Sequence, residues 1–176
     1  MHKGLQLAKD KLVSIDFEEK VIKHMKNREV AGIDYQVMDA LNMTFENGSF
    51  NHAVDKGTLD ALCADRSPET TSKVIQYFNE IVRVLKPSGG TYVCVSLLQD
   101  FVLDALVSYF NKGFGNNYSA DNTFEFRIQK IEKLAHKQNP DGTFLIPFYV
   151  TVKRNQIPKD PKFESLRKMM TEKVYF

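Results

Sequence analysis

The sequence predicts an α/β fold in which a mostly parallel sheet ends in an antiparallel hairpin. Short apolar runs alternate with segments of helical spacing along most of the chain, as in repeated strand–helix units. Near the C-terminus two strand-like segments flank a turn that is too short for a parallel crossover. The 176 residues, 43% of them hydrophobic, suffice for one buried core.

The N-terminal part begins with alternating strands and a helix. Leu12, Val13 and Ile15 make a short apolar strand that ends at an aspartate, and the apolar residues after it recur at helical spacing. In chain order we expect a strand over 11–17, a helix over 18–28, a strand over 33–38 and a strand over 50–54.

The second part continues the alternation and then changes to a hairpin. Ser67 can cap a helix whose first residue is Pro68, and the segment Lys86–Gly90 ends that helix. A strand over 91–98, a helix over 101–110 and strands over 123–133 and 143–153 follow. The last two strands flank the turn Asn139–Gly142, so we expect them to pair antiparallel.

Composition excludes several classes of function. The 24 basic and 22 acidic residues leave a net charge of +2, so no global field attracts nucleic acid. Cys63, Cys94 and the four histidines have no metal-ligand spacing, and we predict no metal site. No run approaches 18 apolar residues, which predicts no membrane span and a cytoplasmic, reducing location.

Three aspartates follow predicted strands, where open α/β sheets bind ligands. Asp16 is placed to accept hydrogen bonds from ribose hydroxyls, and Asp39 from an adenine amine, with Ala40 leaving room for the flat base. Asp55 follows the next strand, beside Lys56. Each aspartate alone is better explained as a turn former, but three in register favour a binding site.

Several segments carry a resemblance to a known family. The most specific is Asp55–Ala61, which reads DKGTLDA; Ser14–Phe17, Val21–Met25, Met38–Ala40 and Glu80–Pro87 accompany it. Together they resemble class I methyltransferases related to the elongation factor 1-alpha lysine and N-terminal methyltransferases, over about residues 12–154.

The resemblance implies a Rossmann-like domain over 1–154, a tail over 155–176, and S-adenosyl-L-methionine as cofactor. It also implies methylation of a protein amine, a lysine or an N-terminus, with elongation factor 1-alpha as a candidate substrate. The implied cofactor residues are Asp16, Phe17, Asp39, Ala40 and Asp55. The substrate-side candidates are Lys56, Gly57, Thr58, Leu59 and Asp60. No residue is identified as the catalytic base, and the oligomeric state is not predicted.

The sequence departs from this family at its start. Family members carry a first strand and a glycine loop before the strand that ends in Asp16, whereas only Met1–Asp10, with Gly4, stands there. We expect an N-terminally incomplete domain with two unpaired inner strand edges and weak or no cofactor binding, unless other backbone fills the position. Two other functions remain open: an inactive interaction module, and a nicotinamide oxidoreductase, which would share the ribose aspartate but not the hairpin.

Overall fold

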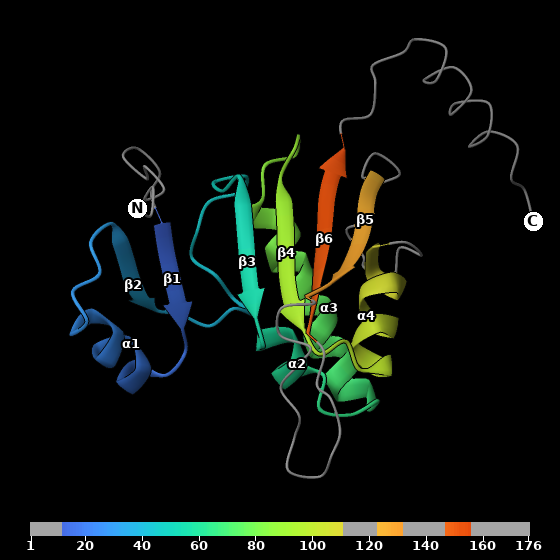
Figure 1. Cartoon of the computed structure of the whole chain (residues 1–176), viewed down its shortest axis with the longest axis horizontal. Coiled ribbons are helices and arrows are strands. Elements are labelled where there is room, and N and C mark those ends of the chain that lie inside the picture. Colours follow the sequence, from blue (N-terminus) through green and yellow to red (C-terminus); the bar gives the residue numbers. More distant parts are fainter. Residues whose placement is uncertain (1–11, 111–122, 132–146, 156–176) are drawn as a thin grey trace, which may run out of the picture.

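The computed structural model describes residues 12–110, 123–131 and 147–155 (Figure 1). Its N-terminal elements are β1 (Leu12–Asp16), α1 (Glu19–Lys26), β2 (Ile33–Val37), β3 (His52–Lys56) and α2 (Thr58–Leu62). Its C-terminal elements are α3 (Pro68–Val84), β4 (Thr91–Ser96), α4 (Asp100–Phe110), β5 (Thr123–Lys130) and β6 (Phe148–Asn155). In the described part of the chain no helix is long and apolar enough to cross a membrane.

The strands form two sheets, one parallel and one mixed. β1 pairs with β2 in parallel, and a second sheet has the order β3-β4-β6-β5. β3 and β4 are parallel, whereas β6 is antiparallel to both β4 and β5, which confirms the expected C-terminal hairpin pairing. β1 and β3 run in the same direction in Figure 1 but share no ladder. This mixed α/β architecture is the predicted fold class.

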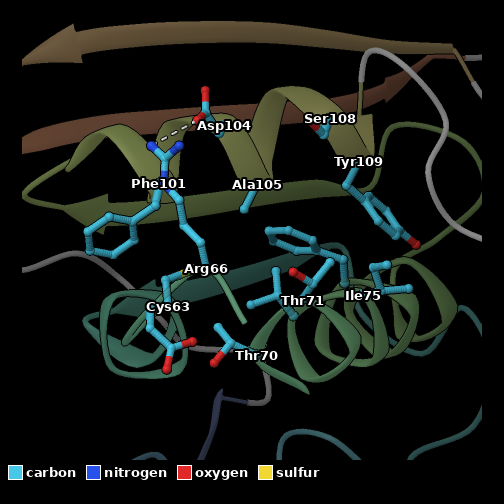
Figure 2. A pocket seen from close by; sticks show the side chains of 13 residues that line it. Cys63, Arg66, Thr70, Thr71, Ile75, Phe101, Asp104, Ala105, Ser108 and Tyr109 are labelled. Atoms are coloured by element: carbon cyan, nitrogen blue, oxygen red, sulfur yellow. Dashed lines mark ion pairs between the residues drawn. The ribbon is translucent and has the colours of Figure 1, made fainter. Parts of the chain in front are cut away.

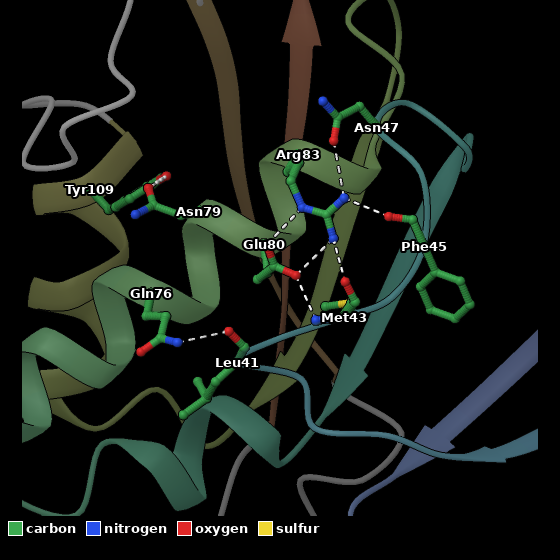
Figure 3. A network of polar contacts seen from close by, with 9 residues as sticks. All are labelled: Leu41, Met43, Phe45, Asn47, Gln76, Asn79, Glu80, Arg83 and Tyr109. Carbon is green, nitrogen blue, oxygen red and sulfur yellow. Dashed lines mark hydrogen bonds and ion pairs between the residues drawn. The ribbon is translucent and has the colours of Figure 1, made fainter.

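The core lies between the four-stranded sheet and helices α2, α3 and α4. Phe78 of α3 and Tyr92 of β4 are almost completely buried and stack edge to face. Tyr109 of α4 points toward α3 (Figure 2). Its hydroxyl donates to Asn79 Oδ1 at 2.7 Å (Figure 3). The β1–α1–β2 unit buries much less, because only Ile22 and Tyr35 are fully enclosed there.

The chain from β2 to β3 is clamped to α3 by polar side chains (Figure 3). The Arg83 guanidinium pairs with Glu80 at 2.7 Å and donates to the carbonyl oxygens of Met43 and Phe45. Glu80 Oε2 in turn accepts from Met43 N at 2.6 Å. Because charged groups make most of these bonds, the segment after Ala40 is held firmly on the larger sheet's side of the molecule.

Several element bounds differ from the sequence prediction, chiefly those of β3 and of β6, which covers Phe148–Asn155 and not 143–153. β3 begins at His52 and includes Asp55, because Phe50 instead forms an isolated parallel bridge with Leu85 at the end of α3. The short helix α2 was not predicted; Gly57, with a φ of +87°, lets the chain turn directly from β3 into it. The hairpin turn at 139–142 and the tail after 155 lie outside the described residues, and the domain limits stay predictions.

Candidate functional site

The first part of the candidate site is the carboxyl edge of the β1–β2 sheet. Asp16 is the last residue of β1 and is in register with Val37, the last residue of β2, so Asp39 lies two residues beyond the end of the neighbouring strand. Asp16 Oδ1 accepts from Glu18 N at 2.8 Å, and Asp39 Oδ1 accepts from Leu41 N at 2.8 Å. Each carboxylate thus forms a local turn with one oxygen. The turn role and the binding role are compatible, because the second oxygen is not used in either turn.

Two apolar residues follow these aspartates and differ in exposure. Phe17 is 72% exposed, so its ring is available to a ligand at this edge. Ala40 is partly buried and packs against the core cluster, which fixes the backbone next to Asp39. A flat purine between an aromatic ring and a small residue, with carboxylates at the ribose and the amine, matches this set of groups. That these four residues contact the adenosine part of the cofactor stays a prediction.

Asp55 is oriented differently from the other two aspartates. Its side chain is 4% exposed, and its carboxylate accepts from the backbone N–H groups of Thr58 at 2.8 Å and Leu59 at 3.0 Å. The hydroxyls of Tyr77 and Tyr92 also donate to it, both at 3.0 Å. The carboxylate therefore caps α2 and joins it to α3 and β4 inside the core. A direct contact of Asp55 with the cofactor stays a prediction, and these bonds favour a structural role.

The tyrosines around Asp55 are fixed as donors. Burial, chiefly, and the nearby Asp55 carboxylate raise the pKa of Tyr77 far above its ordinary value, and burial does the same for Tyr92. Both hydroxyls remain protonated at neutral pH, so they keep donating to the carboxylate. Burial likewise raises the pKa of the adjacent Cys94 thiol to about 12, which makes that cysteine unreactive.

The segment Lys56–Asp60 lies at the carboxyl end of the larger sheet. Lys56 is exposed at the end of β3, and Leu59 is completely buried. Asp60 contacts the end of β4, because its carboxylate accepts from the Ser96 hydroxyl and, at 3.4 Å, from Leu97 N. Ser96 Oγ also accepts from Leu98 N at 2.8 Å. Asp60 is thus held at the end of β4. Its role on the substrate side stays a prediction.

The sequence reading did not identify Ser96, Tyr77 or Tyr92. A signal existed for Ser96, because it is a small polar residue at the end of an apolar strand, where the same rule that selected the aspartates applies. The tyrosines carried no signal, since their roles depend on Asp55, which is 22 and 37 residues away along the chain. Across the described ranges no group of three histidine, cysteine or acidic residues could hold a metal ion.

With this geometry established, the comparisons with known proteins give the class of protein. A family model described as a methyltransferase domain matches residues 2–93. The chain therefore belongs to the methyltransferase domain family, whose methyl donor is S-adenosylmethionine. This match confirms the resemblance noted in the sequence and decides against the nicotinamide alternative.

Relatives of this chain are named as eEF1A lysine and N-terminal methyltransferases. The chain is 34% identical over 147 residues to the eEF1A lysine and N-terminal methyltransferase homolog of Drosophila pseudoobscura pseudoobscura, covering 80% of this chain and 20% of that protein. It is 41% identical over 105 residues to the eEF1A lysine and N-terminal methyltransferase of Xenopus laevis, covering 58% of this chain and 15% of the relative. The chain spans about a fifth or less of the length of these relatives.

Solved structures share the fold at low identity. A SAM-dependent methyltransferase from Methanosarcina mazei superposes with a TM-score of 0.54 at 13% identity, covering 82% of both chains. The N-methyltransferase NodS from Bradyrhizobium japonicum, in complex with S-adenosyl-L-homocysteine, gives 0.53 at 15% identity and covers 82% of this chain and 66% of NodS. These similarities establish the methyltransferase fold.

Proposed function

We propose that this chain forms the cofactor half and part of the substrate side of a protein methyltransferase that acts on a lysine or N-terminal amine. The observation that carries the proposal is the placement of Asp16 and Asp39 at adjacent ends of parallel strands, with Phe17 and Ala40 beside them. The relatives are named for the methylation of eEF1A, which makes eEF1A the first candidate substrate.

Methyl transfer to an amine requires no covalent intermediate with the protein. S-adenosylmethionine supplies a methyl group on a positively charged sulfur. An N–C bond forms as the S–C bond breaks, the electron pair stays on sulfur, and the amine proton passes to solvent. The residues at the carboxyl edge must align the amine and keep it deprotonated. Asp60 is the carboxylate nearest this task in the Lys56–Asp60 segment, and it is already oriented by Ser96.

A methyl-transfer assay tests the proposal. The full chain is incubated with methyl-labelled S-adenosylmethionine and purified eEF1A, beside Asp16→Ala and Asp34→Ala variants. Asp34 is a matched control, since its exposed carboxylate accepts from Gln36 within the same small sheet. We expect label in eEF1A from the wild type and Asp34→Ala but not from Asp16→Ala. Equal labelling by all three would remove Asp16 from the site.

A second candidate function is partner binding without turnover. One observation favours it: within the described strands, β1 pairs only with β2 and β3 only with β4, so the two sheets share no ladder. A site divided between two sheets is less rigid than one built on a continuous sheet. Stable binding of eEF1A with no label transferred, and no retention of S-adenosylhomocysteine, would support this candidate over the enzyme.

A further inference from the structure

A cavity of about 230 Å³ lies on the helical side of the larger sheet, between α3, α4 and the loop after α2 (Figure 2). None of the predicted cofactor or substrate-side residues lines it. Its walls are mainly apolar and are formed by Val74, Ile75 and Phe78 of α3 and Phe101, Ala105 and Tyr109 of α4. The cavity is therefore a separate feature from the carboxyl-edge site.

The size of the cavity restricts what it can hold. Pockets for cofactors and drug-sized ligands usually measure about 300 to 1,000 Å³, so this volume is too small for a nucleotide cofactor. It suits one large apolar side chain. Such side chains, inserted into a desolvated pocket, provide much of the binding energy at protein interfaces.

The rim of the cavity carries exposed charged side chains. Figure 2 shows Arg66, from the loop after α2, reaching Asp104 on α4, and the two groups are 3.3 Å apart. Both side chains are 67% exposed, and exposed pairs of this kind contribute little stability. Asp65 adds a second carboxylate, whose pKa is lowered to about 2 by hydrogen bonds with Ser67 and Thr70. Two carboxylates and one guanidinium give the rim a net negative charge, which favours a basic group on the partner.

Cys63 forms part of the cavity wall and gives it no covalent chemistry. The residue is 3% exposed, and burial, together with the nearby Asp60, raises the pKa of its thiol to about 11. A protonated, buried thiol behaves as a small apolar surface. This supports an apolar occupant and argues against a nucleophilic or metal-binding role.

The cavity is connected to the carboxyl edge by rigid elements. Cys63 caps the C-terminal end of α2, the helix that carries Asp60 and is anchored to Asp55. Phe101 lies in the first turn of α4, shortly after β4 ends at Ser96. The helix that carries Asp60 thus ends at the cavity wall.

We propose that this cavity is a docking site for one apolar side chain, next to a lysine or arginine, of the protein that the domain methylates. The identity of the partner rests on the proposed function. The cavity, its rim charges and its occupant do not depend on turnover, so binding can be measured separately.

Methyl NMR of the full chain provides the test, with capped nonapeptides of glycine and serine as probes. One peptide carries a central leucine between two lysines; in two others the leucine is alanine, or the lysines are glutamates. We expect saturable shifts of the Val74, Ile75 and Ala105 methyls with the first peptide. Affinity should fall roughly tenfold or more with alanine and up to about fivefold with glutamate.

Matched variants locate the binding. Ala105→Leu fills the cavity and should abolish the shifts, whereas Ser72→Leu adds an exposed leucine on α3 outside the cavity lining and should leave them unchanged. If Ala105→Leu melts without cooperativity, Asp104→Asn is used in its place. The difference in affinity between the lysine-flanked and the glutamate-flanked leucine peptides should then become smaller. No saturable shift with any peptide, or equal affinity for the leucine and alanine peptides, would overturn the docking site.

Titration of the same samples with S-adenosylhomocysteine separates the two proposals. Ala105→Leu should bind it as the wild type does. If no form of the protein binds S-adenosylhomocysteine while peptide binding persists, the proposed function fails and the docking site stands. If the protein binds S-adenosylhomocysteine and no peptide gives a saturable shift, the docking site fails and the proposed function stands.

Discussion

Asp55 shows how one buried carboxylate can organise a segment of the candidate site. It accepts two backbone N–H groups and two tyrosine hydroxyls, so replacing one oxygen by an amide leaves at least one donor facing another donor. We expect Asp55→Asn to lower the free energy of unfolding by about 3 kcal/mol. Urea unfolding measures this, with Asp34→Asn as the exposed control. If Asp55→Asn lowers the free energy of unfolding no more than Asp34→Asn does, the Asp55 carboxylate does not stabilise the fold as proposed.

Asp60 is predicted to act on the substrate side. Asp60→Asn keeps the size of the side chain and one acceptor for Ser96, so the fold should persist. Turnover with eEF1A should fall more than affinity for S-adenosylhomocysteine, because the carboxylate faces the strand ends and not the adenosine groups. The measurement is kcat with a parallel titration of the ligand. A loss of ligand affinity with unchanged kcat would reverse the assignment.

At the scale of elements, the Glu80–Arg83 clamp has a predictable pH dependence. Hydrogen bonds from Arg83, chiefly, lower the pKa of Glu80 below its ordinary 4.5. A lowered carboxyl pKa contributes stability above that ordinary value and loses it as pH falls through the folded-state pKa. The stability difference between wild type and Glu80→Gln should therefore be constant near neutral pH and shrink below about pH 4.5.

The matched control for the clamp is Glu69→Gln. Glu69 pairs with Lys73 on the same helix, but its side chain is 78% exposed, so the effect on stability should be small at every pH. Thermal melts between pH 3 and pH 7 measure both variants. A Glu80→Gln effect that is no larger than that of Glu69→Gln would show that the clamp does not hold the segment after β2.

The elements also show what the sequence could predict. Apolar periodicity located β1, α1, β2, α3, β4 and α4 to within about two residues, and Ser67 caps α3 as expected. The helix α2 was not predicted, because five residues are too few to show a helical period of apolar side chains and because the start of α2 depends on the buried Asp55. A rule about strand ends selected Asp16 and Asp39, and their binding role stays a prediction. The inward orientation of Asp55 depends on distant tyrosines and could not be predicted from local sequence.

At the scale of the whole molecule, the two sheets should differ in local stability. β4 and β6 contribute Tyr92, Cys94, Val150 and Val152 to the buried core, while the smaller sheet contributes only Tyr35 as a fully buried strand residue. Regions with few buried contacts open at lower free energy. We expect the amides of β1 to exchange with deuterium faster than those of β4, measured by NMR. Equal protection would indicate that the sheets open as one unit.

The most direct test of the proposed cofactor site is an NMR titration of the full chain with S-adenosylhomocysteine up to millimolar concentration. We expect saturable amide shifts at Asp16, Phe17, Asp39 and Ala40 in wild type and in Asp34→Ala. In Asp16→Ala the affinity should fall by about 2 to 3 kcal/mol, the loss of a charge-assisted contact. No shift in any form, or the same affinity in Asp16→Ala as in wild type, would contradict the cofactor site proposed at the β1–β2 edge.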